Sequence, residues 1–521
     1  MRDCVLAIDL GTSGPKVAVV TLDAAVLGWQ TRATKLVLHD GGGAEQDPHD
    51  WWQAIVAAAR AVLEQTGAAE RIAAVAVTSQ WGGTVLTDEH GEPLRPAIIW
   101  MDSRGARHVP QLCDGRVRVA GYGARKLSRW IRITGGAPSL AGKEPVAHLL
   151  WLRHHEPELL RRAAWILEPK DWINVKLTGE FRATYDSIAL HWATDNRNIH
   201  AVRYDPTLLD WIGVAREKLP DLCGATDIIG TLTRSAAEQL GLRGEIAVVG
   251  GTPDLQSAAV GSGAVRDGEA HLYVGTSSWI NCHVPFKKTD LLHNMASLPS
   301  SLPGRYFAAA AQETAGVCFE HLRDHFLFAD DGLGTGPVPD DFWARVEALA
   351  GSSPPGSRGL IFTPWLYGER SPVADRTIRA GFHNLSLQTR RPELLRSVYE
   401  GVAFNTRWLM QQLERFVGAR CEPIRFIGGG ASSRLWCQIM ADVLDREIHQ
   451  VVDARACNAR GAALLASLGL GHLRVEDIPG RVGVAERFAP TASVREVYDH
   501  QFEQFVALYR KNAPIHRRLN G

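Results

Sequence analysis

The chain has 521 residues, more than one hydrophobic core usually organises, so at least two sizeable domains are expected. Hydrophobic residues make up 45% and charged residues 22%, and 57 Lys and Arg balance 57 Asp and Glu. This composition is typical of a globular protein and argues against a nucleic-acid binder, which needs a basic surface. The eight cysteines include no C-x-x-C pair and no histidine cluster at zinc spacing, which predicts free thiols and a cytoplasmic location. No apolar run approaches the roughly 18 residues of a membrane span, and a strand-like start argues against a signal peptide.

Short apolar strands alternate with longer amphipathic helices along the chain, which predicts an α/β protein. The first two strands are expected at residues 4–10 and 16–20, joined by a Gly-rich turn into a β-hairpin. Asp47 and Pro48 are residue types that favour the N-cap and first position of a helix, here expected over residues 48–63. A buried strand is then predicted at residues 72–78.

A second hairpin of similar design is predicted at residues 271–284, near the middle of the chain. Superposing its Gly-Thr-Ser turn on the turn of the first hairpin places Asp9 opposite Tyr273. The match indicates an internal duplication in which one copy kept the carboxylate, although chance similarity of two short turns is an alternative. The second copy begins where a second lobe should begin, which favours duplication.

Several stretches have the composition of surface loops or ends. Gly, Pro and Asp dominate residues 40–43, 330–339 and 352–356, which predicts inserted loops. Residues 494–509 are expected to form a helix. The basic residues 510–520 are expected to be a solvated end rather than a binding element.

The two Gly-Thr-Ser turns could bind phosphate groups. No Walker A sequence is present, which excludes an ordinary P-loop. Turn amides and the hydroxyl groups of Thr12, Ser13, Thr276 and Ser277 can instead converge on an anion. Asp9, on the strand that leads into the first turn, could hold Mg²⁺ through water. One such turn alone is more simply a hairpin turn, but two in corresponding positions favour a phosphate site.

Asp254 lies where a predicted strand, residues 248–252, turns into a helix of small residues. An Asp at this place could be only the N-cap of the helix. It could also be a general base that accepts the proton of a substrate hydroxyl as that hydroxyl attacks phosphorus. The small residues that follow would allow another segment or a nucleotide to approach closely.

A third Gly-rich turn, Gly428 to Gly430, follows a predicted strand and precedes a helix over residues 435–444. Such a turn lets a flat ring lie against the backbone, and the helix N-terminus favours a phosphate nearby. Asn458 could contact a ribose or a base, or it could cap a helix.

Taken together, these motifs resemble the FGGY carbohydrate kinase family, and within it the xylulokinases, over most of the chain. The motifs occur in the family's order and are specific to it. They are residues 9–14 with Lys16, residues 45–52 with Trp51 and Trp52, residues 91–104 with Trp100, Asp102 and Arg104, and residues 368–372, 393–401 and 428–442.

The resemblance implies two actin-like, RNase H-like lobes around a central cleft for ATP and Mg²⁺. Residues 1–257 would form the first lobe with most of the sugar site, and residues 258–521 the second lobe with most of the nucleotide site. Asp254 would be the catalytic base and, with Asp9, a metal ligand. The acceptor would contact Gln80, Trp81, Trp100, Asp102, Arg104 and Asp254. The nucleotide would contact Gly11, Thr12, Ser13, Lys16, Gly275, Thr276, Ser277, Gly429, Gly430, Ser433 and Asn458. A homodimer is implied by the resemblance alone.

The sequence departs from the xylulokinase pattern around the acceptor. Xylulokinases usually carry Gln-Met-His-Gly where this chain has Gln80 followed by Trp81, Gly82 and Gly83, and Asn where it has Leu255. Thr and Pro also replace Gly-Gly immediately before Asp254. A pocket that loses polar partners discriminates strongly against an unmatched hydroxyl.

We therefore expect a kinase whose favoured acceptor is a ketopentose such as xylulose. The alternatives are a kinase for another polyol or an aldonate, and a sensor of the same fold that has lost phosphoryl transfer. A chaperone-like ATPase is disfavoured by the predicted sugar-site strand.

Overall fold

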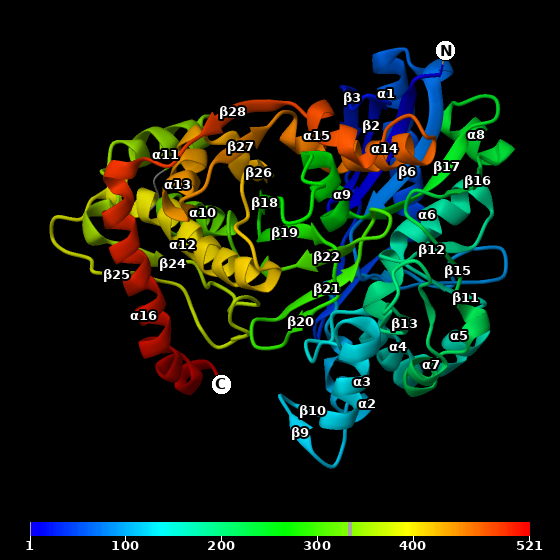
Figure 1. Cartoon of the computed structure of the whole chain (residues 1–521), viewed down its shortest axis with the longest axis horizontal. Coiled ribbons are helices and arrows are strands. Elements are labelled where there is room, and N and C mark those ends of the chain that lie inside the picture. Colours follow the sequence, from blue (N-terminus) through cyan, green and yellow to red (C-terminus); the bar gives the residue numbers. More distant parts are fainter. Residues whose placement is uncertain (1, 332–335) are drawn as a thin grey trace.

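The computed structural model describes residues 2–331 and 336–521, which form two α/β lobes side by side (Figure 1). The first lobe is built on a six-stranded sheet with strand order β16-β17-β6-β1-β2-β3. Its strands are β1 (Cys4–Gly11), β2 (Gly14–Thr21), β3 (Val26–Thr31), β6 (Ile72–Ser79), β16 (Ile228–Thr231) and β17 (Ala247–Pro253). The predicted hairpin and the predicted strand at 72–78 are both present.

The second lobe is built on a nine-stranded sheet with the order β20-β21-β22-β19-β18-β26-β27-β28, and β23 pairs with β19. Its strands are β18 (Ala270–Val274), β19 (Ser278–Val284), β20 (Thr289–Asp290), β21 (Met295–Pro299), β22 (Tyr306–Ala309), β23 (Ala311–Gln312), β26 (Ile424–Ile427), β27 (Ile448–Val451) and β28 (Val484–Phe488). The second predicted hairpin is therefore also present, as β18 and β19.

The two sheets share one strand pattern, which supports an internal duplication. In the first sheet β1 pairs antiparallel with β2 and parallel with β6, and β6 pairs parallel with β17. In the second sheet β18 pairs antiparallel with β19 and parallel with β26, and β26 pairs parallel with β27. Hairpin and parallel strands thus occupy corresponding places, so the two Gly-Thr-Ser turns are structurally equivalent.

Two helices cross between the lobes. Helix α9 (Asp254–Ser262) follows β17, and helix α14 (Cys457–Gly469) follows β27 and packs on the sheet of the first lobe (Figure 1). A Cβ atom on Gly261 would lie 1.9 Å from the carbonyl oxygen of Cys457, and one on Gly461 would lie 1.9 Å from that of Ser257. Only glycine allows backbones this close, so the crossing fixes how the lobes meet.

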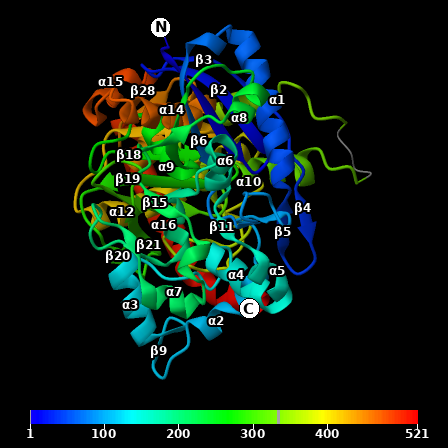
Figure 2. The same cartoon turned by 90° about the vertical axis from the view of Figure 1, so that its right-hand side faces the viewer.

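A largely helical region lies below the first sheet and is inserted between β6 and β16 (Figure 2). It contains the buried aromatic side chains of Trp130 and Trp192 in a core of its own. Its longer helices are α3 (Ala124–Thr134), α4 (Pro145–His155) and α7 (Pro206–Ile212), with a short 3₁₀-helix at Ser187–His191. The inserted region also contains α6 (Pro169–Thr178), whose buried side chains pack in the core of the first sheet.

The predicted helix starting at Asp47 is α1 (Pro48–Thr66), and the Asp47 side chain accepts a hydrogen bond from His49 N at 2.8 Å. The predicted loop at 40–43 is the turn between β4 (Val37–His39) and β5 (Gly43–Gln46). Of the predicted loop at 330–339, residues 332–335 lie outside the described residues. No helix in the described part of the chain has both the length and the apolar character that a membrane span needs.

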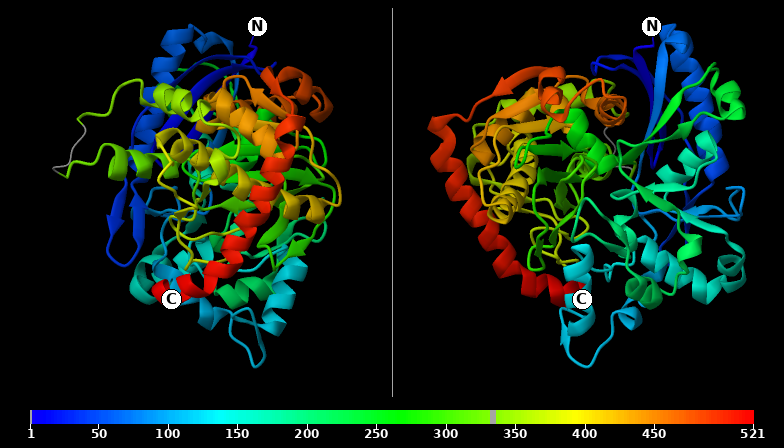
Figure 3. Two further views of the ribbon diagram at one scale, coloured as in Figure 1. Left: turned by 90° about the vertical axis from the view of Figure 1, so that its left-hand side faces the viewer. Right: turned by 45° about the vertical axis from the view of Figure 1, so that its right-hand side comes forward.

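The predicted C-terminal helix is longer than expected and includes the basic end, residues 510–520, which is mostly exposed. Helix α16 runs from Arg495 to Asn520, along the outside of the second lobe (Figure 3, left). Ala513 is buried, and Asn520 Nδ2 donates to the carbonyl oxygen of Thr377 at 2.9 Å. The buried side of this helix lies mainly in its first half, at Tyr498, Phe502 and Phe505, and the basic residues after Tyr509 remain exposed. The other helices of this lobe are α10 (Val317–Leu322), α11 (Phe342–Gly351), α12 (Arg391–Val417) and α13 (Arg434–Leu444).

Candidate active site

Asp9 and Asp254 meet at one edge of the first sheet. Asp9 lies opposite Thr78 near the end of β1, and β17 ends beside the same strand, with Pro253 opposite Ser79. Burial, and then the nearby charge of Asp9, raise the pKa of Asp254 to about 7. Burial also raises the pKa of Asp9, against the opposing effects of Lys16 and a hydrogen bond with Asn458. Two carboxylates that disfavour each other's ionisation suit proton transfer or a divalent cation.

Asp254 is not the N-cap of α9. The cap residue is Pro253, and Asp254 is the first residue of the helix. Its hydrogen bond within the described chain is local: Oδ1 accepts from Leu255 N at 2.7 Å. The carboxylate is half-buried and keeps acceptor capacity for a further group, as a general base requires.

The first hairpin turn is bonded to the predicted acceptor residues. Trp100 Nε1 donates to Thr12 Oγ1 at 3.0 Å, and Thr12 Oγ1 donates to Gln80 Oε1 at 3.3 Å. Gln46 Nε2 donates to the Thr12 carbonyl oxygen at 2.8 Å, and Gln80 Nε2 donates to Gln46 Oε1 at 2.8 Å. Gln46 is a site residue that the sequence analysis did not predict, although it lies in the family motif at residues 45–52.

The other residues of the first turn shape the hairpin, and Lys16 lies beside Asp9. Gly11 and Gly14 close the hairpin, and Gly14 has a φ of 132°, where a Cβ atom would lie 2.0 Å from the carbonyl oxygen of Arg32. Ser13 is exposed at the tip of the turn. Lys16 lies opposite Asp9 in the hairpin register and donates through Nζ to the carbonyl oxygen of Arg455.

The second turn is packed against the start of α10. Gly275 N bonds to the Ser277 carbonyl oxygen at 2.9 Å, and Gly316 N bonds to the Gly275 carbonyl oxygen at 2.7 Å. A Cβ atom on Gly316 would lie 2.5 Å from that oxygen. The Thr276 side chain is exposed and that of Ser277 is partly exposed, so both remain accessible to a ligand.

Tyr273 takes the place that corresponds to Asp9 in the second hairpin. Its ring stacks on Trp279 with centroids 3.8 Å apart. Burial and then the charges of Asp254 and Asp9 raise the pKa of Tyr273 to about 12, so the phenol lies near both carboxylates. Superposing the two turns predicts that Tyr273 corresponds to Asp9, but nothing in the sequence shows that it lies near the carboxylates.

The Gly-rich turn of the second lobe holds its backbone close to β18. Gly428 has a φ of 87°, and a Cβ atom there would lie 2.5 Å from the Val274 carbonyl oxygen. One on Gly430 would lie 2.9 Å from the Val274 side chain, whereas one on Gly429 would meet no atom within 4 Å. Ser433 Oγ accepts from Trp436 N at 3.1 Å and so caps α13. The exposed backbone of Gly429 is thus the part of this turn open to a ligand.

Asn458 lies near the start of α14 and does not cap it, because the cap residue is Ala456. Its side chain bonds to Asp9 instead, and its carbonyl oxygen accepts from Ser257 Oγ at 2.7 Å. The structure therefore places Asn458 beside the carboxylate pair.

Asp102 and Arg104 belong to a buried ion-pair network. Arg104 Nε donates to Asp102 Oδ2 at 2.8 Å and Arg104 Nη2 to Glu45 Oε1 at 2.5 Å. Burial of Glu45 favours a higher pKa, but Arg104 and Arg95 outweigh it and lower the pKa of that carboxyl. The Arg104 guanidinium also lies 3.9 Å from the ring centroid of Trp151. Much of the bonding capacity of these two predicted acceptor residues is therefore used within the protein.

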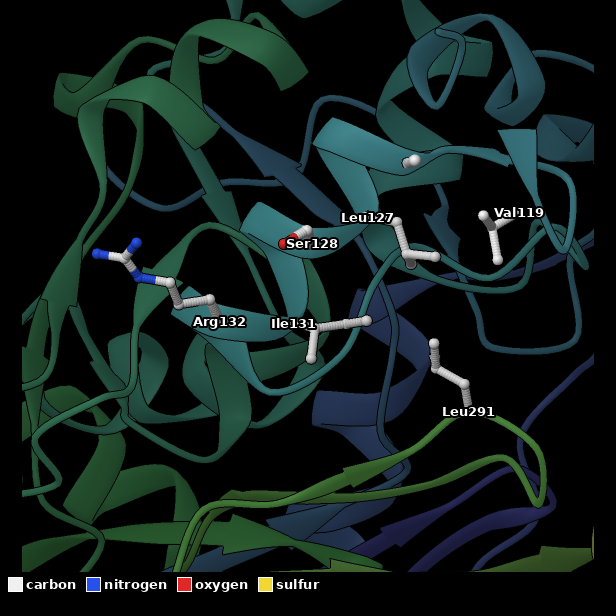
Figure 4. Close-up of a pocket in the computed structure, with 7 residues that line it drawn as sticks. Val119, Leu127, Ser128, Ile131, Arg132 and Leu291 are labelled. Carbon is white, nitrogen blue, oxygen red and sulfur yellow. The ribbon is translucent and has the colours of Figure 1, made fainter. Parts of the chain in front are cut away.

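Trp81 is held by the inserted helical region, because its Nε1 donates to the Ser187 carbonyl oxygen at 2.9 Å. A hollow of about 420 Å³ lies on the surface of that region, between α3 and Leu291 (Figure 4). Its lining includes Leu127, Ile131 and Arg132 and none of the predicted site residues.

The family models match almost the whole chain. The N-terminal domain model of the FGGY family of carbohydrate kinases matches residues 4–261, and its C-terminal domain model matches residues 270–470. The chain belongs to the FGGY family of carbohydrate kinases. It is a sugar kinase with the two-lobed fold of that family, as the sequence predicted.

Relatives with different named substrates match over nearly full length. A xylulose kinase of Staphylococcus epidermidis is 28% identical, with 99% of this chain and 98% of the relative covered. An autoinducer-2 kinase of an Enterobacter species is 28% identical over 97% and 93% of the two chains. A gluconokinase of Bacillus subtilis is 24% identical over 98% and 96%.

Solved structures agree in fold. The xylulose kinase from Rhodospirillum rubrum has a TM-score of 0.84 at 27% identity, covering 99% of this chain and 100% of that one. The gluconate kinase from Lactobacillus acidophilus has a TM-score of 0.85 at 23% identity, covering 99% of each chain, and shows the fold alone. Family membership supports ATP as the phosphoryl donor but does not specify the acceptor.

Proposed function

We propose that the protein transfers the γ-phosphoryl group of ATP to a hydroxyl group of a ketopentose such as xylulose. The observation that carries the proposal is the carboxylate pair, Asp9 and Asp254, where β1 and β17 end beside β6. Full-length similarity to xylulose kinases supports the choice of acceptor.

In this mechanism Asp254 accepts the proton of the attacking hydroxyl. The hydroxyl oxygen forms a bond to the γ-phosphorus as the bond from that phosphorus to the bridging oxygen of ADP breaks. The raised pKa of Asp254 makes it a stronger base than an ordinary carboxylate, at the expense of being half-protonated near pH 7. Thr12, Ser13, Thr276 and Ser277 bind phosphate oxygens with the turn amides, and the Gly428–Gly430 turn and Ser433 border the nucleoside.

Asp9 and Asp254 would hold Mg²⁺, since carboxylate and phosphate oxygens are the ligands that this ion prefers, and the ion would neutralise phosphate charge. The described residues contain no group of three or more His, Cys, Asp or Glu placed to hold a metal. A site completed by nucleotide phosphates fits this small set of protein ligands.

The acceptor lies against Gln80, Trp81 and Trp100 in this proposal, and Asp102 and Arg104 shape the site through the network with Glu45. A different polyol or an aldonate is the second candidate, because relatives named autoinducer-2 kinase and gluconokinase also match over more than 90% of both chains. A sensor that has lost transfer is disfavoured by the retained base.

The deciding experiment is ADP release from MgATP measured with a panel of ketoses, polyols and aldonates. Release that depends on xylulose is the expected result, and release with another acceptor alone would replace xylulose. Binding of an acceptor without release would favour the sensor.

Three further properties are proposed with this function. Residues 1–257 and 258–521 are taken as the two functional halves, although this boundary falls inside α9. A homodimer is proposed from the family resemblance, and light scattering of the purified protein would test it. A cytoplasmic location agrees with eight free, buried cysteines.

A further inference from the structure

The turn that follows Gln80 rests on a carboxyl group from the inserted helical region. Glu168, the residue before α6, accepts hydrogen bonds at Oε2 from Gly82 N at 3.1 Å and Gly83 N at 3.0 Å. Gly82 has a φ of 82°, and a Cβ atom on Gly83 would lie 2.5 Å from Pro169 Cγ. The turn is therefore packed directly on the start of α6, and among residues 2–331 and 336–521 the Glu168 side chain is the acceptor for both amides.

The same helix also holds the strand that leads to Asp254. Lys170 Nζ and Asn174 Nδ2 each donate to the Gly250 carbonyl oxygen at 2.9 Å. All three side chains, those of Glu168, Lys170 and Asn174, are almost fully buried. One rigid element thus fixes both the turn at Gly82 and the backbone four residues before Asp254.

One oxygen of the Glu168 carboxyl, Oε2, accepts both amides. Burial, and then the charge of Asp171, hold the pKa of Glu168 well above its usual range. The other oxygen, Oε1, lies 3.7 Å from Nδ1 of the buried His191, and neither atom has a hydrogen-bond partner among the described residues.

We propose that Glu168 is a positioning residue for the acceptor, which it serves by fixing the turn Gln80–Gly83 at a set distance from Asp254. This inference rests on the proposed function, because the turn matters only if an acceptor binds there. Reacting groups must be held near 3 Å apart, and a displacement of about 1 Å can cost roughly 10²-fold in rate. Loss of the two hydrogen bonds releases residues 82 and 83 and the acceptor with them, while Gln80 keeps its bonds to Gln46 and Thr12 and so leaves the nucleotide turns in place.

Three substitutions and one control test the proposal. Glu168→Gln keeps a carbonyl oxygen for both amides, and Glu168→Leu removes that oxygen. Glu168→Asp shortens the side chain by one methylene group and moves the oxygen away from the amides, and it serves as the test if the Leu variant does not fold. Glu400→Gln is the control, since Glu400 is a buried carboxyl of the second lobe that accepts from Gly356 N at 2.9 Å. Acceptor and ATP kinetics are measured separately, and hydrogen exchange is measured at the amides of residues 82 and 83.

We expect Glu168→Leu to lower kcat/KM for the acceptor about 10²-fold with the KM for ATP within about twofold, and Glu168→Asp to lower it about tenfold. Glu168→Gln should stay within about threefold of wild type, and Glu400→Gln should change stability without changing the acceptor KM. Both amides should exchange faster in the Leu and Asp variants.

Equal losses in acceptor and ATP kinetics, or faster amide exchange with unchanged acceptor kinetics, would overturn the positioning role alone. No acceptor-dependent ADP release by the wild type would overturn the proposed function as well.

Discussion

Substitution of Asp254 by Asn is the sharpest test of the carboxylate pair. The amide keeps the shape of the side chain but cannot accept the hydroxyl proton. A general base contributes about 10²–10⁴-fold to a rate. Acceptor-dependent kcat should therefore fall by about 10²–10⁴, which is roughly 3–5 kcal/mol in the activation barrier. ATP binding should persist, because Thr12, Ser13, Thr276 and Ser277 are unchanged.

The pKa of Asp254 predicts two pH effects of known sign. Because the base works deprotonated and its pKa is about 7, wild-type kcat/KM should fall as pH decreases below 7. This folded-state pKa lies above the usual 3.8, so the folded protein keeps a proton that the unfolded chain has lost between about pH 4 and 7. Asp254 therefore costs stability as pH rises through that window, and Asp254→Asn should raise Tm more at pH 8 than at pH 4.

The assay couples ADP release to NADH oxidation, with ATP binding measured by calorimetry and Tm by scanning calorimetry at both pH values. The acceptor is the best one found in the panel. Near-normal turnover by Asp254→Asn would remove Asp254 from the role of base. A loss of turnover accompanied by a lower Tm at both pH values would indicate a damaged fold instead.

Three other experiments have distinct expected outcomes: a pair of glycine substitutions, a substitution of Thr12, and thiol labelling. Gly461→Ala should lower stability by about 1–3 kcal/mol in chemical denaturation, because its methyl group would meet the Ser257 carbonyl oxygen, whereas Gly480→Ala, with open space around its Cβ position, should have little effect. Thr12→Val breaks the bonds from Trp100 and to Gln80, so the acceptor KM should rise about 5–10-fold, and an unchanged KM would separate this turn from the acceptor. All eight thiols are buried, so a thiol reagent should label the native protein at far below one equivalent and the unfolded protein at eight.

Local signals were enough to locate the hairpins and Asp254 from the sequence. A Gly-rich turn between two apolar strands predicts a hairpin without knowledge of distant residues, and β1–β2 and β18–β19 form as expected. The strand-to-helix transition at Asp254 is equally local.

Long-range contacts were beyond the sequence. Gln46 joins the site only because β5 brings it to Thr12, and Tyr273 lies near the two carboxylates only because the lobes meet. Glu168 acts on a turn 85 residues away in the chain. Asp102 and Arg104 were recognised as a motif, but their commitment to Glu45 depends on burial, which no motif states.

The departures around the acceptor form one connected structural unit. Trp81 bonds to Ser187, the amide of Gly82 bonds to Glu168, and Thr252 donates to Asp186. All three partners lie in the inserted helical region, on or beside α6 and the Ser187–His191 turn. Trp81, Gly82 and Thr252, which differ from the xylulokinase pattern, are therefore each held by a residue of this one region.

It follows that changing one of these residues alone to the residue of the xylulokinase pattern should not restore a xylulokinase-like pocket. At Gly82 a histidine would have to adopt a φ of 82°, a backbone conformation that residues with a side chain rarely adopt. We expect Gly82→His to weaken every acceptor that the wild type uses. Improved use of xylulose by this variant alone, measured as kcat/KM, would show that the pocket tolerates changes one residue at a time and would contradict the coupling argued from these contacts.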